Sequence, residues 1–185
     1  ALIVLLQFNK ITILMAIASM PLAFTYPYMK RFTYWPQLYL GITFNYGLLL
    51  GWTSTQGFIN IIPIIFYIGA IFWTLGYDTI YGFQDINDDE IIGVKSTSIK
   101  FKNNPKFFIT TCYLITIISI ILTGYLMNLN NLFFIFCIIP IIHLFFFQIK
   151  SLDTSREKIC LKIFKSNSYF GLIIFLNILI GKINF

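Results

Sequence analysis

Charged residues are scarce in this sequence, and their scarcity excludes the commonest class of protein. Asp, Glu, Lys and Arg together make up 11% of the 185 residues, whereas about a quarter of the residues of a soluble globular domain are charged. Hydrophobic residues make up 58%, and the mean hydropathy is +0.81. An ordinary soluble domain is therefore excluded. For a membrane protein, the thickness of the bilayer sets the length of the apolar segments that cross it.

Cysteine and histidine are also few. The three cysteines form neither a disulfide framework nor a zinc-binding pattern. Cys112 and Cys137 lie in apolar runs and Cys160 lies in a basic loop, so we interpret all three as structural thiols. The single histidine, His143, lies inside an apolar run. A lone membrane histidine can be a proton relay or a metal ligand, but without partners we interpret it as a hydrogen-bonded packing residue.

Long apolar runs are what the sequence has instead. A helix that crosses a bilayer takes roughly 17–25 residues, and six runs reach that length. None alternates apolar and polar residues as a porin strand does. We predict an all-α transmembrane bundle with six full spans, after the stub of an earlier helix at residues 1–6. The spans are residues 10–28, 37–54, 61–80, 107–127, 132–149 and 167–183.

The basic residues predict the orientation of these spans. If the spans alternate, the loops 29–36, 81–106 and 150–166 lie on one side, and they carry 11 of the 13 basic residues. The connections 55–60 and 128–131 on the other side carry none. By the positive-inside rule, the charged loops face the cytoplasm or the mitochondrial matrix. Attraction to lipid head groups then explains the net charge of +6 without a nucleic-acid partner.

Most of the acidic residues lie in one short stretch. The sequence YDTIYGFQDINDDE, residues 77–90, holds five of the seven. On one continuous helix, Asp78, Tyr81, Asp85 and either Asp88 or Asp89 would share a face. Carboxylates in such a row repel one another unless a cation lies among them. Magnesium fits, because it is usually held by one or two carboxylates together with substrate phosphates.

Two other interpretations of the acidic stretch are weaker. A calcium-binding EF-hand loop that started at Asp85 would need glycine at its sixth position and glutamate at its twelfth, where the sequence has Glu90 and Ser96. A solvated acidic loop would explain the last three acids of the stretch. It explains Asp78 less well, because that residue ends an apolar span.

A basic turn lies on the same predicted side. The turn YPYMKRF contains Lys30 and Arg31, and Lys95 follows the acidic stretch in GVKST. These residues could simply anchor helix ends and fix the topology. They could also form an anion-binding clamp opposite the acidic stretch. Carboxylates, cations and an apolar bundle together suit a substrate with a diphosphate head and a long apolar tail.

Three stretches resemble the UbiA superfamily of intramembrane prenyltransferases, and most closely its 4-hydroxybenzoate polyprenyltransferase branch. They are YPYMKRFTYWPQLYLG at 26–41, GYDTIYGFQDINDDEIIGVKST at 76–97 and SNSYFGLIIF at 166–175. The resemblance runs over the whole chain and is most specific in the second stretch. It implies a bundle of nine helices around a lipid-open cavity, whose later helices are those found here. The implied reaction is prenyl transfer from a polyprenyl diphosphate to the ring of 4-hydroxybenzoate, in ubiquinone biosynthesis.

The resemblance also implies roles for individual residues. Asp78, Asp85 and Asp89 would hold magnesium on the diphosphate, and Asp78 and Asp85 would thereby act in catalysis. Tyr81 would contact the diphosphate or shield the prenyl cation.

The resemblance gives the substrate-binding residues as well. Arg31 would bind the carboxylate of the aromatic acid, and Lys30 and Lys95 would bind phosphates. By its position at the start of the last span, and apart from the resemblance, Asn167 could line the cavity or bond between helices, and we keep it as a substrate-binding candidate. The partners are therefore the two substrates and membrane lipid, and the location is a bacterial or mitochondrial inner membrane.

One feature of the family is missing. A first aspartate-rich motif should precede the second, but no acidic residue precedes Asp78, and the chain starts inside the apolar run ALIVLL without a signal peptide. We therefore expect residues 1–185 to be an N-terminally truncated UbiA-type domain that is inactive alone. The alternatives are a prenyltransferase for another aromatic acceptor, such as a naphthoate, and a membrane transporter with a cytoplasmic acidic gate. A membrane scaffold without chemistry would leave the acidic stretch unexplained.

Overall fold

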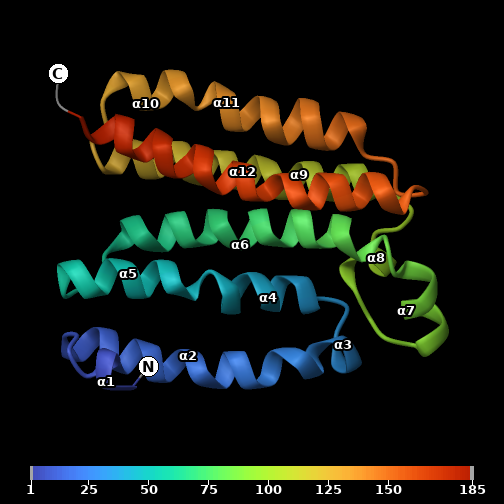
Figure 1. The fold of residues 1–185 in the computed structure, drawn as a ribbon, viewed down its shortest axis with the longest axis horizontal. Coiled ribbons are helices and arrows are strands. Elements are labelled where there is room, and N and C mark those ends of the chain that lie inside the picture. Colours follow the sequence, from blue (N-terminus) through green and yellow to red (C-terminus); the bar gives the residue numbers. More distant parts are fainter. Residues whose placement is uncertain (1, 184–185) are drawn as a thin grey trace.

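The computed structural model describes residues 2–183, and all regular elements in that range are helices. The long helices lie side by side along the long axis of the molecule (Figure 1). In chain order the elements are α1 (Leu2–Leu5), α2 (Lys10–Thr25), η1 (Tyr26–Tyr28), α3 (Met29–Phe32), α4 (Pro36–Phe44), α5 (Tyr46–Gln56), α6 (Ile61–Gly82), α7 (Ile86–Ile92), α8 (Thr97–Lys100), α9 (Pro105–Leu126), α10 (Asn131–Phe136), α11 (Ile138–Ile141), η2 (Ile142–Ile149) and α12 (Glu157–Lys182).

The prediction of an all-α transmembrane bundle is confirmed, with a different number of uninterrupted spans. Helix α1 forms the predicted stub, of which Ala1 lies outside the described residues. Within residues 2–183, five helices are long and apolar enough to cross a membrane, against the six predicted. They are Lys10–Phe32, Ile61–Gly82, Pro105–Leu126, Asn131–Ile149 and Glu157–Lys182.

The predicted span that is not one continuous helix, residues 37–54, is divided into α4 and α5 at Asn45. The backbone of Asn45 leaves the helical region, with φ −83° and ψ 1°. Its side-chain amide donates hydrogen bonds to the carbonyl oxygen of Gly41 at 2.8 Å and to Thr74 Oγ1 on α6 at 2.7 Å. An Asn side chain that bonds to nearby backbone offers the chain an alternative to continuous helix. The break thus ties α4 to α6.

The last helix begins earlier than predicted. Helix α12 starts at Glu157, so ten residues that were assigned to the loop 150–166 are helical. Cys160 and Ile163 are fully buried, while Lys158, Lys162 and Lys165 are exposed. This one-sided burial pattern is that of an amphipathic helix, which a search for continuous apolar runs does not detect.

Helix α6 lies at the centre of the bundle, where it contacts α4, α5, α9 and α12. Its glycines allow close approach to α9. A Cβ atom on Gly76 would lie 2.5 Å from the ring of Tyr113, and one on Gly69 would lie 2.7 Å from Ser119 Cβ. Small residues allow such approach between membrane helices. The core between α6, α9 and α12 therefore holds the ends of these helices in fixed positions.

Candidate functional site

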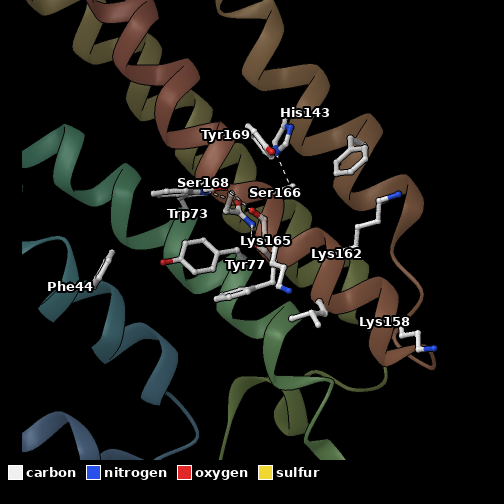
Figure 2. A pocket seen from close by; sticks show the side chains of 14 residues that line it. Phe44, Trp73, Tyr77, His143, Lys158, Lys162, Lys165, Ser166, Ser168 and Tyr169 are labelled. Atoms are coloured by element: carbon white, nitrogen blue, oxygen red, sulfur yellow. Dashed lines mark hydrogen bonds between the residues drawn. The ribbon is translucent and has the colours of Figure 1, made fainter.

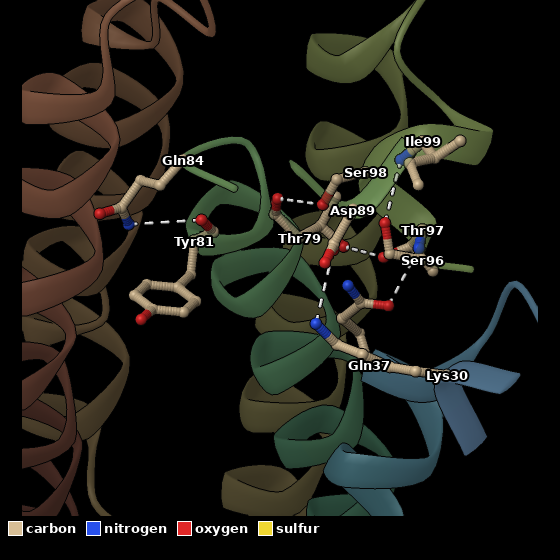
Figure 3. Close-up of polar contacts among 10 residues, drawn as sticks. All are labelled: Lys30, Gln37, Thr79, Tyr81, Gln84, Asp89, Ser96, Thr97, Ser98 and Ile99. Carbon is tan, nitrogen blue, oxygen red and sulfur yellow. Dashed lines mark hydrogen bonds and ion pairs between the residues drawn. The ribbon is translucent and has the colours of Figure 1, made fainter. Parts of the chain in front are cut away.

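The basic turn and the acidic stretch meet at one end of the bundle. We call this region, residues 29–35 and 83–104, the charged end; it contains α3, α7 and α8 (Figure 1). The backbone N–H of Lys95 donates to the carbonyl oxygen of Lys30 at 2.8 Å. The ammonium of Lys30 lies 3.4 Å from Asp89 Oδ2 (Figure 3). Segments about sixty residues apart in the chain are therefore joined here by both backbone and side chains.

Buried hydroxyl and amide groups fix the segment that follows α7. The side chain of Gln37, on α4, accepts a hydrogen bond from the backbone N–H of Thr97 at 2.9 Å. The hydroxyls of Thr79 and Thr97 are 2.6 Å apart, and Ser98 Oγ donates to the carbonyl oxygen of Thr79 at 2.8 Å (Figure 3). Sequence reasoning missed Gln37, Thr79 and Thr97. The run of hydroxyl residues at 96–98 is a signal for Thr97, but Thr79 lies outside it.

The acidic residues do not share one continuous helix, so that prediction is wrong. Helix α6 ends at Gly82, the following Phe83 is buried, and α7 starts after Asp85. Asp78 is half-buried on α6, Asp85 is exposed between the helices, and Asp89 on α7 is buried. Among residues 2–183, no three His, Cys, Asp or Glu side chains lie close enough together to hold a metal ion.

The acidic residues also differ in their ion pairs. Asp89, with its side chain only 12% exposed, pairs with Lys30, and Glu90 pairs with Lys102 at 2.6 Å. Within the described range, no ion pair involves Asp78 or Asp85. A buried carboxylate needs a partner, whereas an exposed one is stabilised by water. In the acidic stretch, Asp78, Asp85 and Asp88 are the carboxylates without an ion pair within the described range.

The remaining predicted cations lie at the same end. Arg31 is exposed on α3. The ammonium of Lys95 donates to the carbonyl oxygen of Phe32 at 3.5 Å and lies 5.5 Å from the centre of the Tyr34 ring. The structure thus brings Lys30, Arg31 and Lys95 into one region.

Tyr81 points away from this polar cluster (Figure 3). Its exposed ring lies 4.6 Å from the ring of Phe164 on α12, and the ring of Tyr77 lies 5.7 Å from that same ring. The acidic end of α6 is therefore in contact with α12 through aromatic rings.

A cavity of about 1150 Å³ adjoins these rings. Its lining comes from α6, η2 and α12, with Phe44 of α4 opposite (Figure 2). The apolar part of the lining includes Trp73, Tyr77, Phe147 and Phe164. The cavity is thus largely aromatic and lies next to the helix that carries Asp78.

Asn167 lines this cavity but is bound within the protein. Its side-chain oxygen accepts from Trp73 Nε1 at 2.9 Å and from Gln148 Nε2 at 3.0 Å, and Tyr113 donates to Gln148 Oε1 at 2.5 Å. Its amide nitrogen donates to the carbonyl oxygen of Ile163 at 3.1 Å. We call Trp73, Tyr113, Gln148 and Asn167 the buried polar network. A substrate contact by Asn167 stays a prediction.

The other residues that the sequence singled out have structural surroundings. His143 Nε2 lies 3.3 Å from Ser166 Oγ, and its ring packs against Phe147 at 5.4 Å. The three cysteines are free and buried. The placement of Cys160 in a loop was wrong, because it is fully buried on α12.

Comparison with known proteins gives consistent results. The sequence model of the UbiA prenyltransferase family matches residues 1–179. The chain is 42% identical over 183 residues to 4-hydroxybenzoate geranyltransferase 2 of Lithospermum erythrorhizon, covering 97% of this chain and 59% of that protein. It is 41% identical over 184 residues to the mitochondrial 4-hydroxybenzoate polyprenyltransferase of Bos taurus, covering 99% of this chain and 49% of that protein. The chain thus spans about half the length of the curated relatives it matches.

A solved structure has the same fold. The apo structure of a UbiA homologue from Aeropyrum pernix matches with a TM-score of 0.79 and 18% identity, over 97% of this chain and 67% of that one.

Proposed function

The chain belongs to the UbiA prenyltransferase family, and on that premise we propose that the protein transfers a polyprenyl group from polyprenyl diphosphate to the ring of 4-hydroxybenzoate. The observation that carries the proposal is the position of the charged end. The charged end follows directly on the end of α6, where the ring of Tyr77 contacts Phe164 of α12, and both of these residues line the aromatic cavity. A diphosphate with a long apolar tail needs this combination. The substrates named for the relatives support the same choice.

We also propose that the reaction uses magnesium. The groups available at the charged end and at the adjoining end of α6 include carboxylate oxygens, which a hard cation prefers. Asp78 and Asp85 would bind the ion, and Asp89 would join them when its ion pair with Lys30 opens. Two carboxylates suffice, because substrate phosphates supply further ligands. When bound, magnesium neutralises the diphosphate while its bond to carbon breaks.

The basic side chains would bind the acidic groups of both substrates. Lys30 and Lys95, joined through their backbones at 2.8 Å, would bind the diphosphate. The planar guanidinium of Arg31 matches a carboxylate and would hold the aromatic acid. Because Arg31 recognises only the carboxylate, another aromatic acid such as a naphthoate is the second candidate acceptor.

The aromatic side chains would protect the reactive intermediate. Loss of diphosphate leaves an allylic cation, which the ring carbon ortho to the hydroxyl attacks before a proton leaves that carbon. The faces of Tyr81 and Phe164, 4.6 Å apart, would stabilise the cation and exclude water. We place the charged end on the cytoplasmic or matrix side of a bacterial or mitochondrial inner membrane, because its lysines follow the positive-inside rule.

Prenyl transfer in membranes tests the proposal. Membranes that contain the intact protein are given polyprenyl diphosphate, 4-hydroxybenzoate and magnesium, and the prenylated product is measured. The variant Asp85→Ala should abolish the product, whereas Asp153→Asn, in the loop before α12 and outside the site, should not. Turnover with a naphthoate alone would change the acceptor. No consumption of diphosphate with any acceptor would refute the proposed reaction.

A further inference from the structure

Three lysines on α12 form a row that the proposed reaction does not use. Lys158, Lys162 and Lys165 are separated by four and three residues, so they lie on one face of the helix. All three line the cavity (Figure 2). Lysines that only anchor a helix end in the head-group layer have no reason to share a cavity wall. We call these three residues the lysine row.

The positive charge of the lysine row is not balanced within the described part of the protein. The ion pairs found in residues 2–183 use Lys30, Lys102 and Arg156, not the lysine row. None of the residues that line the cavity is acidic. Like charges at this spacing repel one another. A bound anion would relieve that repulsion, and without a carboxylate in the lining the anion would meet ammonium groups rather than a metal ion.

The rest of the lining defines what kind of anion fits. Phe44, Trp73, Phe147 and Phe164 give the cavity an aromatic wall. The volume of about 1150 Å³ exceeds what a free phosphate requires. Basic pockets between membrane helices bind the head groups of anionic lipids. A ligand with a phosphate head and an aliphatic tail satisfies both parts of the lining.

We propose that the lysine row binds the phosphate group of an aliphatic phosphate ester directly, without a divalent cation, while the tail lies along the aromatic wall. Two ligands share this chemistry: a prenyl diphosphate and an anionic membrane phospholipid. The site is separate from Asp78 and Asp85, and it does not require that the protein prenylates an aromatic acid. If the ligand is the prenyl donor, the inference rests on the proposed function and gives the donor a second point of attachment.

Binding without metal tests the proposal. The intact protein in detergent micelles is titrated in EDTA with farnesyl diphosphate and, separately, with dioctanoyl phosphatidic acid. The variant with Lys158→Gln, Lys162→Gln and Lys165→Gln should lose about tenfold or more in affinity for at least one of them. The matched control, with Lys106→Gln, Lys150→Gln and Lys182→Gln, loses the same charge outside the cavity and should bind as the wild type does.

Further measurements assign the outcome. Replacing the lysine row with arginines should keep the affinity, and added salt should weaken wild-type binding. A loss for farnesyl diphosphate alone identifies the prenyl donor, and a loss for phosphatidic acid alone identifies a lipid site. The proposal is overturned if the wild type binds neither ligand, or if the glutamine variant and its control bind alike. Missing prenyl transfer with intact metal-free binding would refute only the proposed reaction.

Discussion

The charged end and the buried polar network differ in how their polar groups are exposed and bonded. At the charged end, Asp85 and Arg31 are exposed, and the ion pair of Asp89 has a half-exposed partner. In the network, Gln148 is fully buried and both ends of its amide are bonded. Exposed groups can exchange water for a ligand at little cost, whereas fully bonded buried groups resist change. We therefore expect the charged end to bind ligands and the network to hold the cavity wall in position.

The largest expected effect is a loss of activity without a loss of stability, at Asp78. Asp78→Asn keeps the shape of the side chain but removes its charge at the proposed metal site. We expect prenyl transfer to fall by about a hundredfold or more, while the thermal midpoint changes little because no ion pair in residues 2–183 involves Asp78. Product formation and a melting curve on the same preparation measure both. A large drop in the melting temperature would instead make Asp78 a structural residue.

The next largest effect, on stability, is expected in the buried polar network. Gln148→Leu removes the acceptor of the Tyr113 hydroxyl, which is 2.5 Å away, and one of the donors to Asn167. Each buried group left without a partner costs about 1–3 kcal/mol. We expect a clear loss of stability, measured by unfolding in detergent. Gln56→Leu, at an exposed position at the end of α5, is the control and should change stability little.

A substitution at the end of α6 is expected to have a smaller effect on stability, which a second substitution should partly reverse. A Cβ atom on Gly82 would lie 2.3 Å from Ser98 Oγ but 3.3 Å from Ser98 Cβ. Gly82→Ala should therefore destabilise by about 1–3 kcal/mol, as overpacking typically does, and adding Ser98→Ala should recover part of that loss. Gly47→Ala, where nothing lies within 4 Å, is the matched control in α5 and should be neutral or stabilising. The absence of any recovery in the double variant would contradict this account.

The sequence predicted the fold class, because long apolar runs determine membrane helices whatever their neighbours are. It failed at Asn45 and at Glu157, where a side chain bonded to another helix and an amphipathic face decided the boundary. At the site, the alternation of the spans placed the basic turn on the same side as the acidic stretch. It could not show that α6 ends at Gly82, because residues 77–90 contain no proline that would mark the break.

The polar contacts of the network show the same limit. Asn167 was predicted to line the cavity, and it does. Its bonds to Trp73 and Gln148 join helices that are distant in the sequence. No local sequence pattern predicts such a partner. An isolated Asn or Gln in an apolar run has the same neighbours in the sequence whether its side chain faces a ligand or another helix.

The smallest expected effect lies within the charged end and compares two neighbouring carboxylates. Asp89 is buried beside Lys30, and Glu90 is 41% exposed in its side chain beside Lys102. Exposed ion pairs contribute about 0–1 kcal/mol, so Glu90→Gln should barely shift the melting temperature. Asp89→Asn should lower the melting temperature more, because Lys30 loses its ion-pair partner and the buried segment loses a charge-assisted hydrogen bond. Double-mutant cycles with Lys30→Met and Lys102→Met measure each coupling energy. A coupling for Glu90 as large as that for Asp89 would mean that burial does not determine which acids at this end are structural.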